Sequence, residues 1–383
     1  MSGTEPSFTV GIQEEYLLVR LDSRDVDEDP PARLLEECTC RSGGQVSPRF
    51  LRSQLEASTR VCRSIPEARA DLARLRGIIS EVARRYGRAP IAAATHPFAE
   101  ATRQITTERE QFFALANEMQ GAARRIMICG MRVHVGIDDD DLRVDLMNQL
   151  TYFVPHLLAL SCSSPFWDGE RTGLMSFRMT LVSSLPRTGL PERFASYAEL
   201  RRNLDMLVRN GVIEHAGKMW WDVRPASLHP ALEVRVMDSC TSIDDATCLA
   251  ALVVSLARRL YRLKLDNRSW RLYPNMLIAE NRWRAMRYSV DGQLLDLARG
   301  ELVAFPQLVA ELIALVRDDA AALGCLRELE HLATVLERGT SAHRQIRAYD
   351  EARAAGASER EALQAVVDFL VKETRVDPER GAE

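Results

Sequence analysis

The chain lacks any apolar run that approaches the roughly 18 residues of a membrane-spanning helix, so we expect no segment inside a bilayer. It also lacks a basic block. Its 50 lysines and arginines face 54 acidic residues, for a net charge of −4, which argues against a nucleic-acid partner. The first residues, MSGTE, show neither the basic region nor the apolar region of a signal peptide. These absences predict a cytoplasmic protein.

Clustered cysteines are also missing. Only Cys38 and Cys40 of the eight cysteines lie close together, and no zinc-ligand spacing appears. We therefore expect reduced thiols. The apolar content of 46% in 383 residues is ample for a core. This length allows one large domain or two fused ones. Because no linker or internal repeat is visible, we predict a single domain over residues 1–383.

Strand-like patterns come early in the chain and helical patterns come late. Capping boxes at Ser64, Ser196 and Ser358, each with a glutamate three residues on, predict three helix starts. From about residue 244 the pattern is almost wholly helical. This order predicts an α+β fold with an antiparallel or mixed sheet covered by helices. We expect strands at 8–20, 90–95, 126–137, 218–224 and 231–238, and helices at about 64–86, 107–125 and 141–162.

Acidic, imidazole and guanidinium groups recur at every second position of the expected strands. Because residues i and i+2 of a strand share a face, Gln13 shares a face with Glu15, and Glu233 with Arg235. Two acids at positions 13 and 15 would make a metal-binding pair, but position 13 is an amide. The pattern therefore indicates an enzyme-like site with altered chemistry. The segments are GIQEEY at 11–16, SQLE at 53–56, GMRVHVG at 130–136 and LEVRV at 232–236.

Short motifs in a fixed order extend over most of the chain. They are GIQEE (11–15), THPF (95–98), GMRVHVGI (130–137), SSPFW (163–167), TGL (172–174), Arg178, WWDVRP (220–225), EVR (233–235), ENRWR (280–284) and GTSAH (339–343). With these motifs the chain resembles the type 2 glutamate–cysteine ligases, also called carboxylate–amine ligases. The resemblance implies a glutamine synthetase-like fold with a curved sheet whose open face binds the substrates.

The resemblance also implies an activity. In this family ATP phosphorylates a carboxylate, usually the γ-carboxylate of glutamate, and an amine, usually that of cysteine, attacks the acyl phosphate. Because these reactants are anionic, the site should use Mg²⁺ held by carboxylates, with arginines on the phosphates. The implied partners are an amino acid and ATP. A homo-oligomer is also implied, and a related ligase subunit is a further conceivable partner.

The sequence departs from the family at its metal-ligand positions. Arginine has no lone pair for a metal and its charge repels one, and glutamine loses the charge of glutamate. We therefore expect weakened divalent-ion binding, with nucleotide binding retained more easily than catalysis. Of six expected ligand positions, Glu15, Glu56 and Glu233 are kept, whereas Gln13, Arg49 and Arg132 replace two glutamates and a histidine.

The same resemblance assigns the remaining roles. Several alternatives stay open: Glu14, which alternates away from Glu15, fits a surface position or a structural ion pair, and both His96 and His134 fit structural roles. Asn281 and its neighbours fit a solvated helix face. The expected catalytic residues are Arg178, Arg224 and Arg235, and the expected substrate- and ATP-binding residues are His96, His134, Arg132, Asn281, Arg284 and Arg287.

Two main functions remain open at the level of sequence. The first is an ATP-dependent carboxylate–amine ligase of the glutamate–cysteine type with weak or altered activity. The second is a catalytically inactive relative that binds a nucleotide or another anion, or acts as a regulatory partner subunit. The matched motifs outside the metal positions favour the first, and the lost ligands favour the second.

Overall fold

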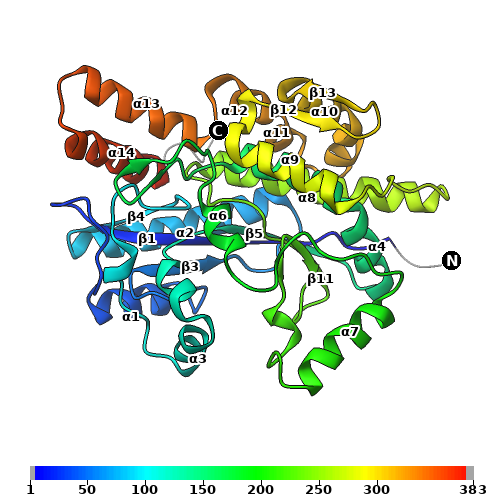
Figure 1. Ribbon diagram of the computed structural model, residues 1–383, viewed down its shortest axis with the longest axis horizontal. Helices are drawn as coiled ribbons and strands as arrows, with labels where there is room; N and C mark the ends of the chain where they lie inside the picture. Colours follow the sequence, from blue (N-terminus) through cyan, green and yellow to red (C-terminus); the bar gives the residue numbers. More distant parts are fainter. Residues whose placement is uncertain (1–4, 377–383) are drawn as a thin grey trace.

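A seven-stranded sheet runs through the centre of the computed structural model, which describes residues 5–376 (Figure 1). The strand order is β10-β11-β5-β1-β3-β2, and β4 pairs with the last four residues of β1. All of these pairings are antiparallel, as the sequence predicts. The strands are β1 (Val10–Arg20), β2 (Val46–Pro48), β3 (Gln54–Ser58), β4 (Arg88–Ile91), β5 (Met131–Gly136), β10 (Val223–Pro225) and β11 (Ala231–Val234).

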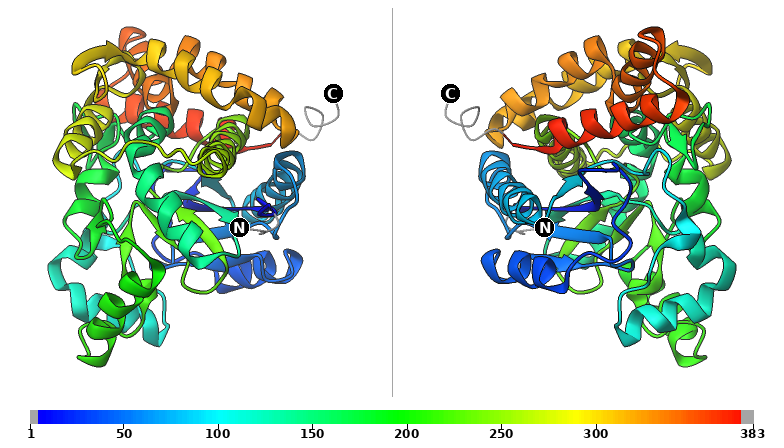
Figure 2. Two further views of the ribbon diagram at one scale, coloured as in Figure 1. Left: turned by 90° about the vertical axis from the view of Figure 1, so that its right-hand side faces the viewer. Right: turned by 90° about the vertical axis from the view of Figure 1, so that its left-hand side faces the viewer.

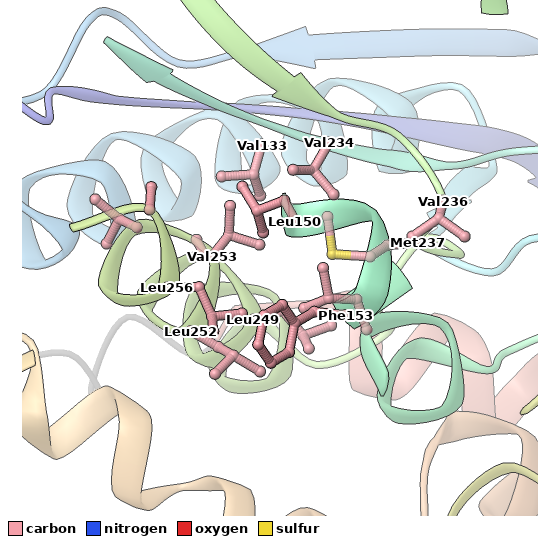
Figure 3. Packing of buried hydrophobic residues seen from close by; sticks show 14 of the residues in the cluster. Val133, Leu150, Phe153, Val234, Val236, Met237, Leu249, Leu252, Val253 and Leu256 are labelled. Carbon is pink, nitrogen blue, oxygen red and sulfur yellow. The ribbon is translucent and has the colours of Figure 1, made fainter. Parts of the chain in front are cut away.

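Helices cover one face of this sheet. The strand residues Val133 and Val234 point toward Leu150 and Val253 of two covering helices (Figure 3). All four side chains are buried, and full burial of such a side chain stabilises the fold by about 1.5 to 3 kcal/mol. The other face is left for polar groups, because alternate strand residues point away from this core. The covering helices include α2 (Ile65–Arg85), α4 (Asp140–Leu150) and α8 (Ile243–Leu265).

The polar side of the sheet is flanked rather than covered. Two helices, α3 (Glu110–Met119) and α7 (Tyr197–Arg209), extend away from the sheet on the side opposite to α8 (Figure 1). The short helix α6 (Arg178–Ser183) lies near the middle of the same view. These three elements leave the central strands accessible between them.

The C-terminal part is mainly helical, as the sequence predicts. Its helices lie in a layer above α8 (Figure 2). One hairpin, β12 (Gln293–Asp296) with β13 (Glu301–Ala304), interrupts them. No helix in the described part of the chain has the length and apolar character needed to cross a bilayer. The helices are α9 (Asn275–Tyr288), α10 (Phe305–Ala322), α11 (Leu326–Glu330), α12 (Leu332–Arg338), α13 (Ser341–Ala354) and α14 (Glu359–Thr374).

The three predicted helix starts are confirmed. The hydroxyls of Ser64, Ser196 and Ser358 each accept a hydrogen bond from the backbone N–H three residues on. The helices begin directly after them, at Ile65, Tyr197 and Glu359. Such caps satisfy donors at the first turn that have no partner inside the helix.

Other boundaries differ from the predictions. The expected helix 141–162 is split into α4 and α5 (Val154–Ser161) by a 3₁₀ turn, because Pro155 at the start of α5 lacks an N–H and clashes with a preceding turn. The strand expected at 126–137 is limited to β5. The one expected at 90–95 is replaced by β4, and residues 218–224 form two short strands. The α-helix and strands not yet named are α1 (Ala32–Arg41), β6 (Phe166–Trp167), β7 (Glu170–Arg171), β8 (Thr188–Gly189) and β9 (Trp220–Trp221).

Candidate active site

The strand register brings the polar side chains into rows on the uncovered face. Glu15 of β1 lies opposite Glu56 of β3, and Gln13 lies opposite Arg132 of β5. The face-sharing predicted from alternate residues therefore holds for β1 and β5. A further row runs from Arg224 of β10 through Glu233 of β11 to His134 of β5.

Two arginines bridge the pair of carboxylates on β1 and β3. Arg132 donates from Nη2 to Glu15 at 2.6 Å and from Nη1 to Glu56 at 2.8 Å. Arg49, just after β2, lies 3.0 Å from Glu15 and 3.4 Å from Glu56. The backbone N–H of Gly130 also donates to Glu15, at 2.9 Å. Burial alone would raise the pKa of Glu15, but Arg132 and Arg49 outweigh it and lower that pKa to about 2.

The third carboxylate is also held by two arginines. Glu233 accepts from Nε of Arg224 at 2.9 Å and from Nη1 of Arg235 at 2.6 Å. Although burial opposes ionisation, these two charges hold the pKa of Glu233 well below its usual range. Burial, followed by the charge of Arg132, lowers the pKa of Arg235 to about 9. That guanidinium therefore stays charged at pH 7.

His134 and Gln13 complete the face as a neutral pair. Nε2 of His134 lies 3.1 Å from Oε1 of Gln13. Because an amide oxygen only accepts, the ring proton sits on Nε2. Burial is the main reason that the pKa of His134 falls to about 4. The imidazole is therefore neutral at pH 7 and has no proton to release as an imidazolium.

Arg178 reaches the same region from the start of α6. It donates to the carbonyls of Val236 and Met237, each at 3.2 Å, and lies 3.5 Å from the buried carboxylate of Asp238. Its guanidinium lies so close to Gly130 that a Cβ there would sit 2.4 Å from Nη2. The glycine of the GMRVHVG segment thus makes room for a charged group beside the carboxylate pair.

These groups line a continuous groove. One part, of about 890 Å³ including its open mouth, is lined by Glu15, Arg178 and apolar residues of α3 and α6. A second part, of about 730 Å³, lies over Glu56, His134 and Glu233. The two parts share Arg49, Arg132, Trp220 and Arg235.

The charge of the groove is positive. Five arginines (49, 132, 178, 224 and 235) face three glutamates (15, 56 and 233), and the lining carboxylate of Asp222 is neutralised by Arg282, which leaves a surplus of two positive charges. Asp238, behind Arg178, offsets one of them. The arrangement favours anionic ligands such as phosphates and carboxylates, which guanidinium groups bind in a bidentate manner.

The residues present do not fit a divalent metal ion. Each of the three retained glutamates is already paired with arginine. Within residues 5–376, no three histidine, cysteine, aspartate or glutamate side chains come together in a way that could hold a metal. A hard cation such as Mg²⁺ needs several oxygen ligands around it, whereas here guanidinium groups occupy that space.

Four of the residues expected to bind substrate or ATP lie outside the groove lining. His96 is fully buried, with Nε2 at 2.9 Å from the carbonyl of Arg24 and Nδ1 accepting from two backbone N–H groups. Asn281 makes two hydrogen bonds to the backbone of Leu295 and so joins α9 to the hairpin. Backbone groups already use the polar atoms of both side chains, and neither residue belongs to the groove lining, so their expected role in substrate binding stays a prediction.

The other two of these four are arginines of α9. Arg284 and Arg287 lie over the ring of Tyr288, and Arg284 donates to the carbonyl of Gln293 at 2.6 Å. Arg284 therefore joins the C-terminal end of α9 to its hairpin, and Arg287 packs against the same end of the helix. Neither arginine belongs to the groove lining, and their expected role at the pocket wall stays a prediction.

The partners in two ion pairs could not be identified from the sequence. Arg282, one residue after Asn281, lies 2.8 Å from Asp222, a residue of the groove lining. Glu14, for which a structural ion pair was one of the open readings, binds the buried guanidinium of Arg76 at 2.9 and 2.7 Å. The motifs ENRWR and WWDVRP contain the first pair, but only the folded chain shows that they meet.

Comparison with known proteins identifies the family. The model for "Glutamate-cysteine ligase family 2" matches residues 9–368. The chain belongs to this family. A Rhodospirillum rubrum protein provisionally named glutamate–cysteine ligase 2 is 52% identical over 374 residues, covering 97% of this chain and 96% of that protein. A Jannaschia protein of the same name is 46% identical over 374 residues, covering 98% of each.

Solved structures share the fold of this family member. A glutamate–cysteine ligase of Francisella tularensis, in complex with AMP, superposes with a TM-score of 0.69 at 13% identity, over 98% of this chain and 90% of that one. A bifunctional glutathione synthetase of Pasteurella multocida gives a TM-score of 0.68 at 14% identity, over 95% of this chain and 52% of that one. At such low identity these matches establish the α+β, glutamine synthetase-like fold alone.

Proposed function

We propose that the chain is an ATP-dependent carboxylate–amine ligase of the glutamate–cysteine type whose phosphate and carboxylate groups are held by arginines. The carrying observation is the pair Arg49 and Arg132, which bridges Glu15 and Glu56 at the floor of a positively charged groove. The family and the relatives' names support the reaction class. The lost metal ligands support a turnover below that of an intact ligase.

The chain's own residues would act mainly by electrostatics. In this proposal Arg132, Arg235 and Arg178 bind the transferring phosphoryl group and the carboxylate that accepts it. Fixed positive groups in a partly closed groove stabilise the developing negative charge without reorganising. His134, neutral at pH 7, would orient ligands by hydrogen bonding rather than supply a proton. The homo-oligomer implied by the resemblance stays a prediction.

The ion pairs between the groove glutamates and arginines support a second candidate function. All three glutamates are neutralised by arginine before any ligand arrives. A protein with this site could bind a nucleotide or another anion without turning it over, and act as a regulatory partner of an intact ligase. The two candidates share the binding groove and differ in chemistry alone.

The test measures binding and turnover separately. ATP is titrated into the protein by calorimetry, with Mg²⁺ and with EDTA, and ADP release is followed with glutamate plus cysteine and with a panel of other carboxylates and amines. ADP release that requires both a carboxylate and an amine supports the ligase. Saturable ATP binding with no release across the panel supports the second candidate. Absence of ATP binding contradicts the ligase and the nucleotide-binding form of the second candidate.

A further inference from the structure

The 890 Å³ part of the groove joins two chemically different ends. One end presents four guanidinium groups, those of Arg49, Arg132, Arg178 and Arg235. The other end is formed by carbon side chains from segments far apart in the sequence. The apolar lining used below consists of Phe112 and Met119 of α3, Met179 and Val182 of α6, Leu185, and Trp220 of β9. An apolar wall open to solvent is unfavourable unless a ligand covers it.

The polar side chains near the apolar end are already engaged, and among them Asp222 pairs with Arg282 at 2.8 Å. Gln54 donates to the carbonyl of Ile128 at 2.9 Å and accepts from the N–H of Leu51 at 3.2 Å. The hydroxyl of Thr188 lies 3.0 and 2.9 Å from the carbonyls of Val182 and Leu185. A purine buried there would give up its hydrogen bonds to water without gaining side-chain partners. A hydrocarbon group has no such bonds to lose.

The charged end has unused capacity for an anion. Its arginines outnumber its glutamates, as described above. In addition, the buried Nε of Arg178 has no hydrogen-bond partner among the described residues. Arg235 donates from Nη1 to Glu233 and lines both parts of the groove. A carboxylate placed between these guanidinium groups would take charge-assisted hydrogen bonds from them.

We propose that this pocket binds a carboxylate whose body is apolar or aromatic, with the carboxylate on the arginines and the hydrocarbon between α3 and α6. The proposal deepens the proposed function, on which it rests for naming this ligand the carboxylate substrate. Glutamate fits the apolar end poorly, because its ammonium and second carboxylate would be desolvated there without partners.

The first experiment measures chain-length dependence in EDTA, without ATP. Butanoate, pentanoate, hexanoate, heptanoate and glutamate are titrated by calorimetry. At about 0.8 kcal/mol per buried methylene, each added methylene should tighten binding about fourfold until the apolar end is filled. Heptanoate should bind at one site per chain and more tightly than glutamate. A flat series, or glutamate binding more tightly than heptanoate, would overturn the proposal.

Matched variants test the apolar end of the pocket. Phe112→Ala removes a ring of the lining, whereas Phe113→Ala removes its exposed neighbour on the same helix. Val182→Thr keeps the side-chain shape, so it guards against a folding defect. We expect Phe112→Ala and Val182→Thr to weaken heptanoate more than butanoate, and Phe113→Ala to leave both unchanged. Equal effects of Phe112→Ala and Phe113→Ala would refute the assignment.

The charged end has its own pair of variants. Arg49→Gln changes a groove arginine, whereas Arg52→Gln changes an arginine that pairs with Asp29 and Glu108 on the surface. Arg49→Gln should weaken every carboxylate in the series by a similar factor, and Arg52→Gln should weaken none. If Arg49→Gln has no effect, or if AMP displaces heptanoate in a manner that depends on Phe112, the pocket is not the proposed carboxylate site.

The failure of this proposal is distinguishable from that of the proposed function. If carboxylate affinity rises with chain length but no amine-dependent ADP release occurs, the pocket assignment is supported and the ligase function is refuted. If glutamate and cysteine give ADP release but carboxylate affinity does not change with chain length, the ligase function is supported and the pocket assignment is refuted.

Discussion

Replacing Arg132 by glutamine should destabilise the protein strongly at neutral pH. The variant leaves Glu15 and Glu56 facing each other on adjacent strands with Arg49 as their remaining cationic partner in direct contact. Both carboxylate side chains are only 11% exposed, so water screens them little. Removing one partner from a buried ion pair typically costs 3 to 5 kcal/mol.

The structure narrows this magnitude. In the fold the pKa of Glu15 falls from 4.5 to about 2, which corresponds to about 3 kcal/mol in favour of its ionised form. Arg132 supplies only part of that effect, because Arg49 and the N–H of Gly130 remain in the variant. Allowing also for the bond lost by Glu56, we expect the free energy of unfolding to fall by about 2 to 3 kcal/mol.

The pH dependence separates electrostatics from packing. In the wild type the depressed pKa of Glu15 contributes stability that is fully present above its unfolded-state pKa of 4.5 and is lost progressively as the pH falls from there through about 2. In the variant, burial and the facing Glu56 raise that pKa, so protonation relieves the repulsion. The difference between the proteins should therefore shrink below about pH 5, by at most about 1.4 kcal/mol per pH unit and carboxylate.

Urea denaturation at pH 7, 5 and 4 is the assay. Arg52→Gln is the matched control, since Arg52 forms surface pairs with Asp29 and Glu108, and it should change stability by no more than about 0.5 kcal/mol. A loss from Arg132→Gln that is the same at pH 4 and pH 7, or no larger than that of the control, would refute the reasoning.

Three further predictions concern buried groups. The imidazole of His134 should stay neutral down to about pH 4 in NMR titration. Because the unfolded chain takes up this proton near pH 6.5, the free energy of unfolding should decrease as the pH falls from 6.5 to 4. Titration of His134 near pH 6.5 in the folded protein would contradict this. Glu14→Gln leaves the buried Arg76 without its bidentate partner and should cost about 3 to 5 kcal/mol in urea denaturation. Gly130→Ala, whose Cβ would overlap Arg178, should weaken ATP binding in calorimetry and lower stability by about 1 to 3 kcal/mol.

The composition of the site face was predictable because it depends on local geometry. Alternation along β1 and β5 is set by each strand's own backbone, so sequence spacing could place Glu15 on the face of Gln13 and Arg132 on the face of His134. That both strands present these residues on the same side of the sheet follows from their pairing. The capped helix starts were predictable for the same reason. The break before Pro155 had a local signal as well, which the apolar pattern of 141–162 obscured.

The partners of these side chains were not predictable from local patterns. Arg132 is 76 positions from Glu56 and 117 from Glu15 in the sequence. The apolar wall comes from α3, α6 and β9, whose approach depends on the whole fold. For Asn281 and Arg284 the motif match was real, yet the polar atoms serve the hairpin beside α9. Sequence spacing places residues on one face of a strand or helix, but it does not show which distant groups form hydrogen bonds or ion pairs with them.

The central claim is that arginines occupy the place where this family's pattern has metal ligands. The most direct test is Mn²⁺ titration without nucleotide, followed by electron paramagnetic resonance, on the wild type and on the triple variant Gln13→Glu, Arg49→Glu, Arg132→His. All three changes make the local field more negative, so the variant should gain Mn²⁺ affinity, and ATP turnover with it. We predict no saturable Mn²⁺ site in the wild type; stoichiometric binding there, with no gain in the variant, would contradict the account.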